Sequence, residues 1–333
     1  MMYCDRLQKR STQTNNISSV LLTMSSELIC LTAAIDEANS APHLAIPQLN
    51  TDGRHFTLNR MGGNFASSVK NVEVADYFLP TALRPGSKVL ELGAAYGLVC
   101  SEAIRRGLPA ICHYVVNDLD KRHLLIFARR LAEEFPLQVA ELEGRLSLLH
   151  GEFPSSRVVE LLMQSGEGQF DAVLSTHFLG WLKPDALVKA FEVVGRLLKP
   201  GGVLCIRGST PYMGYVRQEV RDAIDRQSAE YAQSPCIKMP TAGFIPDFRQ
   251  ALPDRDDIDV EAVMHEIPTG HYFTITAPLV KKLAEDNGMR IERSEYVSDR
   301  FNEDAPDLWN GWALDGRERL VVIARKTDSL ARH

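Results

Sequence analysis

Hydrophobic positions between residues 88 and 208 fall into short uninterrupted runs, and longer amphipathic stretches separate these runs. A run that is apolar at every position is typical of a strand buried on both faces. The alternation of such runs with helix-length segments predicts a mostly parallel sheet built from βαβ units. The predicted strands are Val89–Leu92, Tyr114–Val116, Leu146–Leu149, Phe170–Leu174 and Val203–Ile206.

The stretches between the runs have the periodicity of amphipathic helices. Pro184 suits the first turn of the last stretch, and Lys199-Pro200-Gly201-Gly202 is a stop-and-turn sequence after it. The predicted helices are Leu98–Arg106, Lys121–Glu134, Ser156–Met163 and Asp185–Leu198.

The chain before this core has weaker patterns. Residues Ser18–Asn39 allow one or two helices, and residues 65–79 allow another. Prolines and glycines break the chain between these segments. A helical N-terminal extension over residues 1–80 is therefore expected.

Residues 209–270 interrupt the alternation. Val216, Val220 and Ile224 lie four residues apart, which predicts one face of a helix. Prolines then punctuate a long irregular stretch. We expect these residues to form an insertion that is either a substrate cap or a dimer surface.

The alternating pattern returns after the insertion. Thr276 is placed to cap a helix with Pro278 in its first turn. Arg290–Val297 and Arg319–Ala324 have the pattern of strands, and the link between them is too irregular for a helical crossover. An antiparallel pair is therefore expected.

Composition and charge narrow the classes of protein. The 333 residues are 45% hydrophobic and carry a net charge of −6, which suits a large core and argues against general binding to nucleic acid or anionic membranes. The six cysteines are scattered without a Cys-x-x-Cys pair, which predicts reduced thiols in a cytoplasmic protein and no metal site. Neither a signal peptide nor a membrane span is expected.

The strongest chemical signal is the turn after the first strand. Residues Val89–Gly97 run from a strand through small residues into a helix. Such a turn brings backbone N–H groups close to a ligand, although a plain structural turn is the alternative. The Gly-x-x-x-Gly spacing differs from the Gly-x-Gly-x-x-Gly of dinucleotide-binding enzymes, so a nicotinamide cofactor is disfavoured.

Three more signals follow the next three strands. Asp118 is placed to accept hydrogen bonds from ribose hydroxyls, or else to cap a helix, a role that Asp120 fits equally. Glu152 is placed to meet an adenine amino group with Phe153 over the ring, or else lies in an exposed loop. Residues Ser175–Phe178 leave the fourth strand. All these signals fall at the carboxyl edge of the predicted sheet, where open α/β folds bind ligands.

On these motifs the chain resembles the class I, Rossmann-like S-adenosylmethionine-dependent methyltransferases over residues 85–208 and 271–326. Leu90–Gly97 is similar to the family's cofactor loop, and Leu198–Gly202 to the turn before its fifth strand. The chain departs from the family at Ala95, where Gly is usual. The resemblance implies an α/β fold with a doubly wound, mostly parallel seven-stranded sheet whose last strand is antiparallel.

The resemblance also implies which residues bind the cofactor, S-adenosylmethionine. Asp118 matches the acid that holds the ribose, and Leu119 matches a residue that packs on adenine. Glu91 is expected near the methionine amino group, directly or through the loop backbone. The full predicted set is Glu91, Gly93, Ala94, Ala95, Gly97, Asp118, Leu119, Glu152, Phe153, Ser175 and Thr176.

Methyl transfer from an activated sulfonium is an in-line displacement, so it needs neither a metal nor a covalent nucleophile. A general base helps when the acceptor must lose a proton, and His177 is the candidate. Related enzymes often place a His here that only shapes the pocket. Predicted substrate contacts are Arg60, Tyr212, Tyr215, His271 and Tyr272, with a surface Arg and packing of the cap as the alternatives.

The predicted organisation has four parts: an N-terminal extension and cofactor lid (1–80), a cofactor-binding core (81–208), an inserted substrate cap (209–270) and a completion of the core (271–333). We expect a methyltransferase that acts on a small-molecule acceptor, with no nucleic-acid or membrane partner and with a homodimer as one assembly. The alternatives are a protein methyltransferase, an aminopropyl transferase on the same scaffold, and a catalytically silent scaffold or interaction protein. Ser175–Phe178 lacks the Asn/Asp-Pro-Pro-aromatic run of base-methylating enzymes.

Overall fold

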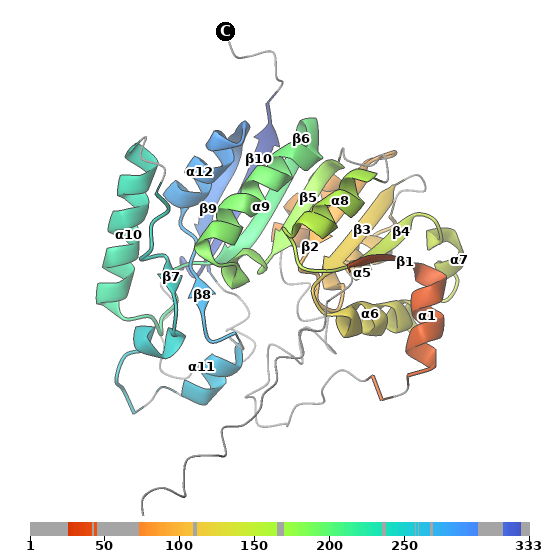
Figure 1. Ribbon diagram of the computed structural model, residues 1–333, viewed down its shortest axis with the longest axis horizontal. Helices are drawn as coiled ribbons and strands as arrows, with labels where there is room; N and C mark the ends of the chain where they lie inside the picture. Colours follow the sequence, from red (N-terminus) through yellow and green to blue (C-terminus); the bar gives the residue numbers. More distant parts are fainter. Residues whose placement is uncertain are drawn as a thin grey trace, which may run out of the picture.

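A computed structural model describes residues 26–41, 43–44, 73–108, 112–164, 170–234, 238–256, 258, 260–266, 269–298 and 316–327. Its centre is an eight-stranded sheet (Figure 1). In spatial order the strands are β1 (Glu27–Cys30), β4 (Leu146–His150), β3 (His113–Asp118), β2 (Lys88–Leu92), β5 (Phe170–Thr176), β6 (Leu198–Ser209), β10 (Arg319–Lys326) and β9 (Met289–Val297).

The pairing confirms the predicted fold class. Strands β4, β3, β2, β5 and β6 are parallel to one another. The last strand, β10, lies antiparallel between β6 and β9, as expected for the final two strands. The chain order reverses between β2 and β5, and an α/β sheet binds ligands at the carboxyl edge beside such a switch.

The eighth strand, β1, corrects the expectation of helix throughout Ser18–Asn39. Residues 27–30 pair antiparallel with β4, and α1 (Leu31–Asn39) begins directly after them. A four-residue segment shows neither a helical nor a strand period clearly, so its structure is decided by the free edge of β4. Residues 1–25 and 45–72, including most of the helix expected over 65–79, lie outside the described residues.

Helices cover both faces of the sheet, and each face has its own hydrophobic cluster. The face turned to the viewer in Figure 1 carries α8 (Ser156–Gln164), α9 (Pro184–Leu197) and α12 (Ala277–Asp286). The other face carries α1, the π-helix η1 (Glu73–Phe78), α4 (Leu79–Ala82), α5 (Leu98–Arg105) and α6 (Lys121–Glu134), with the short α7 (Val139–Leu142) after α6.

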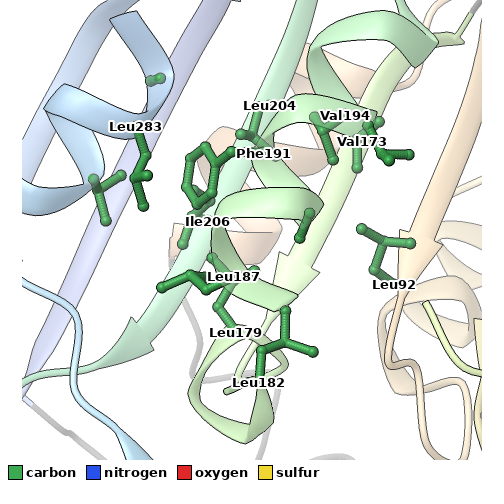
Figure 2. Packing of buried hydrophobic residues seen from close by; sticks show 14 of the residues in the cluster. Leu92, Val173, Leu179, Leu182, Leu187, Phe191, Val194, Leu204, Ile206 and Leu283 are labelled. Atoms are coloured by element: carbon green, nitrogen blue, oxygen red, sulfur yellow. The ribbon is translucent and has the colours of Figure 1, made fainter. Parts of the chain in front are cut away.

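Helix α9 packs on the sheet through its hydrophobic face. Phe191 of α9 lies beside Leu204 and Ile206 of β6, and Leu283 of α12 completes the contact (Figure 2). Burying such a side chain contributes roughly 1.5–3 kcal/mol. Leu198 begins β6 directly after α9, and the predicted turn Lys199–Gly202 lies within β6 as a bulge, because Phe170 pairs with Leu198 whereas Ala172 pairs with Val203.

The hydrogen bond that caps α12 is not made by the Thr276 side chain, as predicted, but by another residue. Thr276 occupies the N-cap position of α12, but its side chain makes no capping hydrogen bond. The Tyr296 hydroxyl instead accepts from the Ala277 N–H at 3.0 Å. A residue from β9 therefore fixes the start of α12.

After β6, the described residues up to 270 form an extension at the β9 end of the sheet, with α10 (Gln218–Gln233) beside α12 (Figure 1). It also contains β7 (Phe244–Ile245), the 3-10 helix η3 (Phe248–Ala251) and α11 (Val260–Glu266). Strand β7 pairs with β8 (Tyr272–Phe273), and another 3-10 helix, η2 (Leu179–Trp181), lies between β5 and α9. Most residues of a third hydrophobic cluster lie in the extension, together with Tyr272 of β8, while Tyr231 and Met239 of the extension join the cluster that contains α9 and α12.

Two further findings concern the described part of the chain. No helix in it has the length and apolarity needed to cross a membrane. The thiols of Cys30, Cys100, Cys112 and Cys205 are free. The compartment of the protein stays a prediction.

Gly97, at the start of α5, offers a test of this packing. Its φ of +66° is left-handed, and a Cβ there would overlap the ring of Phe127. Gly97→Ala should therefore lower the free energy of unfolding by roughly 3 kcal/mol or more, since a left-handed Ala costs about 1–2 kcal/mol and overpacking adds to it. Urea unfolding followed by circular dichroism measures the loss.

Gly107→Ala is the matched control. Gly107 also has a positive φ, of +84°, but a Cβ there would meet no atom within 4 Å. Its loss should be only the conformational part, about 1–2 kcal/mol. Equal losses in the two variants would mean that Phe127 moves aside freely.

Candidate functional site

The turn between β2 and α5 runs through three left-handed residues: Gly93, Ala95 and Gly97 have φ values of +62°, +47° and +66°. Ala95 is strained there, because a left-handed Ala costs about 1–2 kcal/mol. The Ala95 N–H donates to Asp118 Oδ2 at 2.7 Å, and the Ala94 N–H donates to the Asn117 carbonyl at 3.0 Å. Strand β3 therefore holds the turn in a conformation that this sequence does not favour locally.

The glycines of the turn serve packing as well as conformation. A Cβ on Gly93 would overlap the ring of Phe178, which follows β5, and a Cβ on Gly97 would overlap Phe127 of α6. We predicted that small residues let the backbone approach a ligand. Here they let the turn approach two aromatic rings, one on each side of it.

Asp118 is the centre of the site. Its carboxylate is 7% exposed and accepts from Ala95 N–H through Oδ2 and from Asp120 N–H through Oδ1, at 2.7 and 2.9 Å. His123 Nδ1 lies 3.1 Å from the same Oδ1. A carboxylate has about four lone-pair sites, so capacity remains for a ligand hydroxyl. The cap of α6 is Asp120, which accepts from Arg122 N–H at 2.9 Å, so the helix-cap alternative for Asp118 is wrong.

The residue that follows Asp118 in the chain is apolar and exposed. Leu119 is 49% exposed, although it is a large hydrophobic residue directly after a buried strand. The rings of Tyr96, in the turn, and His123, in α6, lie 4.7 Å apart and connect the turn to α6. At this edge the chain thus has a carboxylate followed directly by an exposed hydrophobic side chain.

Glu91 lies behind the turn rather than in front of it. The side chain is buried, accepts from the Tyr114 hydroxyl at 2.9 Å, and is hydrogen bonded to the backbone of Cys100 in the first turn of α5. Burial raises the pKa of Glu91 to about 8. Glu91 therefore supports α5 and the turn from below, which fits the indirect role through the loop backbone better than direct contact.

The exit of β4 differs from the prediction at Phe153. This ring is only 2% exposed and packs against Phe178, with centroids 6.3 Å apart, so it has almost no free surface for an adenine. Glu152 is exposed. The amide of Asn117 donates to the carbonyls of Leu149 and Gly151 at 2.9 and 3.0 Å and fixes this exit to β3.

The two hydroxyl groups predicted as cofactor contacts at the end of β5, those of Ser175 and Thr176, are both buried. Ser175 lines an internal cavity of about 10 Å³ under α9, so its side chain points into the core. The buried hydroxyl oxygens of Ser175 and Thr176 make no hydrogen bond within the described structure. A cavity of this size is at the lower limit for one water molecule. Ser175 is thus a poor candidate for direct contact with a ligand at the edge.

His177 is a poor general base in this arrangement. Its backbone is left-handed, with a φ of +59°, and its N–H donates to the Arg207 carbonyl at 2.7 Å. Its ring Nε2 is hydrogen bonded to the Arg207 guanidinium. Burial, Arg207 and Arg319 hold the pKa of His177 well below its ordinary value. The ring is neutral, and its accepting nitrogen is already engaged.

The predicted substrate contacts that the structure describes have partners within the protein. Tyr215 and Tyr272 belong to the hydrophobic cluster of the extension, and the Tyr212 hydroxyl donates to Asp225 of α10 at 2.7 Å. His271 Nε2 lies 3.2 Å from the Trp181 carbonyl. These contacts favour the alternative of packing within the cap. Arg60 lies outside the described residues.

Sequence reasoning missed Phe178, Asn117, Arg207 and Arg319. The sequence places Phe178 in the segment that follows β5, but no sequence pattern indicates that its ring packs on Gly93. Arg207 offered a signal, because it is a cation that directly follows the apolar run Val203–Ile206.

Comparison with known proteins gives one family match. Residues 90–204 match the model of a family described as a methyltransferase domain. The matched segment begins within β2 and ends within β6, so it contains the turn, Asp118 and the β4 and β5 exits. No curated protein matches the chain in sequence.

Solved structures show similarity at low sequence identity. Phosphoethanolamine N-methyltransferase 2 of Haemonchus contortus, in complex with S-adenosyl-L-methionine, is 17% identical with a TM-score of 0.48, over 80% of this chain and 55% of that chain. The chain thus spans just over half the length of that protein. A putative sarcosine dimethylglycine methyltransferase from Galdieria sulphuraria is 15% identical with a TM-score of 0.43, over 78% of this chain and 85% of that one. An S-adenosylmethionine-dependent methyltransferase from Mesorhizobium loti is 17% identical with a TM-score of 0.45, over 77% and 97% of the two chains.

Glu91→Gln tests the buried carboxyl behind the turn. Because the pKa of Glu91 rises from 4.5 to about 8 on folding, the folded protein keeps a proton that the unfolded chain has released between these pH values. The stability of the wild type should therefore fall as the pH rises through this window, by up to about 1.4 kcal/mol per pH unit. Gln cannot ionise, so the variant should lack this part of the slope in urea unfolding between pH 5 and 8.

Glu160→Gln is the control for this measurement, because Glu160 is an exposed residue of α8. It should keep the wild-type slope. Identical slopes in wild type and Glu91→Gln would show that Glu91 is ionised in the folded protein.

Proposed function

We propose that the chain is an S-adenosylmethionine-dependent methyltransferase that transfers the methyl group of this cofactor to a small-molecule acceptor, since residues 90–204 match the model of a methyltransferase domain. The observation that carries the proposal is the turn after β2 braced by Asp118, with the exposed Leu119 beside it at the carboxyl edge. The remaining lone-pair site of the Asp118 carboxylate suits a ribose hydroxyl, and an open apolar side chain suits the face of an adenine.

Other polar side chains at the carboxyl edge also support S-adenosylmethionine as the cofactor. Asp118 keeps about one lone-pair site beyond those used by Ala95, Asp120 and His123. Glu152 is exposed after β4, and Asn117 ties this exit to β3. The Thr176 hydroxyl is buried without a partner among the described residues. We propose Gly93, Ala94, Ala95, Gly97, Asp118, Leu119, Glu152 and Thr176 as cofactor contacts and Glu91, Phe153 and Ser175 as their support.

The cofactor supplies a sulfonium methyl with an activated leaving group. The protein's part is then to hold the acceptor in line with it and to exclude water, and correct placement supplies much of the rate. We assign no proton transfer to His177, because its Nε2 is hydrogen bonded to Arg207. Its contribution is to the shape of the β5 exit, next to Phe178.

The acceptor class rests on charge. A net charge of −6 gives no general attraction for nucleic acid. The β5 exit, Ser175–Phe178, lacks the run typical of base methylation. The described residues of 209–270 pack, together with Tyr272, as an extension at one end of the sheet, where a substrate cap is expected.

Calorimetric titration of S-adenosylmethionine and S-adenosylhomocysteine tests the proposal. The wild type should bind both at one site. Asp118→Ala should weaken both at least about 10-fold, or about 1.4 kcal/mol, because it removes the ribose acceptor and the brace on Ala95. The absence of binding by the folded wild type would remove the methyltransferase function and leave the scaffold alternative.

Asp171→Ala separates binding from general destabilisation. Asp171 also accepts a backbone N–H, from Lys88 at 2.8 Å, but it lies at the opposite end of β5. This variant should lose comparable stability and keep the wild-type affinity for both compounds. If both variants lose affinity equally, Asp118 acts only through folding.

A further inference from the structure

The carboxylate of Asp118 has three hydrogen-bond donors among the described residues. Its Oδ2 accepts from the Ala95 N–H at 2.7 Å. Its Oδ1 accepts from the Asp120 N–H at 2.9 Å and lies 3.1 Å from His123 Nδ1. An ionised carboxylate only accepts, so Nδ1 carries the proton of this last hydrogen bond. Each carboxylate oxygen has about two lone-pair sites, so the site that remains is on Oδ2.

A ribose asks more of this carboxylate than one site. It presents two neighbouring hydroxyls, and a carboxylate that accepts from both uses one site on each oxygen. The open site on Oδ2 suits one hydroxyl. Both sites on Oδ1 are occupied, one by a main-chain N–H and the other by the His123 ring. The second hydroxyl therefore meets a donor of the protein where it needs an acceptor.

Of the two donors on Oδ1, His123 is the one that can give way. The Asp120 N–H is part of the backbone at the N-cap of α6, and the Asp120 side chain is fixed in turn by the Arg122 N–H at 2.9 Å. His123 lies in the first turn of α6 with its side chain 30% exposed. A half-exposed ring moves by rotation about its side-chain bonds, whereas the cap moves only with the helix.

The surroundings of His123 offer the ring a second place. Its Nε2 lies 3.9 Å from Asp120 Oδ2, so a ring that leaves Asp118 has another carboxylate beside it. Asp120 also binds the Arg122 guanidinium, whose Nε lies 3.0 Å from its Oδ1. The Tyr96 ring, with its centroid 4.7 Å from that of His123, covers the opposite side. The ring is thus held between two carboxylates, one of which belongs to the candidate cofactor site.

A donor in this place has two possible roles. It can support the Asp118 carboxylate in its working position, or it can occupy a site that the ligand needs. The Ala95 N–H already fixes Oδ2, and the Asp120 N–H already fixes Oδ1. Two main-chain donors therefore orient the carboxylate without His123, which favours the second role.

We propose that His123 competes with one hydroxyl of the cofactor ribose for Asp118 Oδ1, and that binding of the cofactor displaces its ring toward Asp120. This inference rests on the function proposed above and concerns how the same site selects its ligand. A ligand with one hydroxyl uses the open site on Oδ2 and leaves His123 in place. A ligand with two hydroxyls gains a second hydrogen bond and breaks the one from His123. His123 thus reduces the preference of the site for a full ribose.

Calorimetric titration of the full chain with S-adenosylhomocysteine tests the competition. His123→Leu removes the donor, keeps an apolar contact for Tyr96 and suits a helix. It should bind S-adenosylhomocysteine roughly 2- to 10-fold more tightly than the wild type, which is the net effect of one hydrogen bond. His123→Asn, which places an N–H where Nδ1 lies, should return the affinity to near the wild-type value. A supporting role for His123 would give weaker binding in His123→Leu.

Deoxynucleosides give a second readout, which a loss of structure does not reproduce. Adenosine, 2′-deoxyadenosine and 3′-deoxyadenosine are titrated as competitors of S-adenosylhomocysteine. The preference for adenosine over at least one of the two deoxynucleosides should be roughly 2- to 10-fold larger in His123→Leu than in the wild type. His113→Leu is the matched control, since His113 is exposed at the opposite end of β3, and it should keep the wild-type affinities.

The outcomes separate this inference from the function on which it rests. If the wild type binds S-adenosylhomocysteine and the folded His123→Leu binds it equally or more weakly, the competition is overturned and methyl transfer stands. An unchanged preference for adenosine also overturns it. If the wild type does not bind S-adenosylhomocysteine, the proposed function itself fails.

A spectroscopic measurement decides the question should His123→Leu fail to fold. Nitrogen-15 NMR at about pH 8 distinguishes a histidine ring protonated on Nδ1 from one protonated on Nε2. The His123 signals are assigned by their absence from His123→Asn. Saturation of the wild type with S-adenosylhomocysteine should move the His123 proton from Nδ1, which faces Asp118, to Nε2, which faces Asp120. An unchanged tautomer overturns the proposal.

Discussion

The hydrogen bond from the Ala95 N–H to Asp118 holds the candidate site together. A turn with Ala in a left-handed conformation is locally unfavourable, and the bond from β3 compensates for that strain. The same carboxylate accepts from Asp120 N–H and lies beside His123, so the turn, the end of β3 and the start of α6 form one unit. Phe178 and Phe127 close this unit on either side, and Glu91 supports it from the core. Any ligand at this edge therefore meets a surface that is already formed.

The sequence predicted much of the fold because its signals there are local. Helix α6 begins and ends at the predicted Lys121 and Glu134, and the central strands contain the predicted apolar runs. Strand β1 was missed because four residues next to a helix carry no period, and only the unpaired edge of β4 makes them a strand. The carboxyl-edge location of the motifs also follows from the sequence, since it depends only on the strands being parallel.

Side-chain direction was harder to predict than position. Consecutive strand residues face opposite sides of a sheet, and a residue after a strand turns according to its loop. Ser175 thus faces the core below α9, while Thr176 faces the other side, although both were given the same role. The ring of Phe153 is buried because it packs against the ring of Phe178. Tyr215 and Tyr272 pack in the extension because Phe248 and Trp181 lie beside them, and sequence spacing does not reveal these partners.

The hydrophobic cluster of the extension has a consequence for how the chain tolerates substitution. Ile245 and Phe248 belong to this cluster and not to the clusters under the sheet, so changes at these two positions should be felt mainly within the extension. Tyr231 and Met239 belong instead to the cluster that contains α9 and α12, and Met213 contacts Arg319 of β10 at 3.5 Å. Changes at these three positions should therefore reach the sheet.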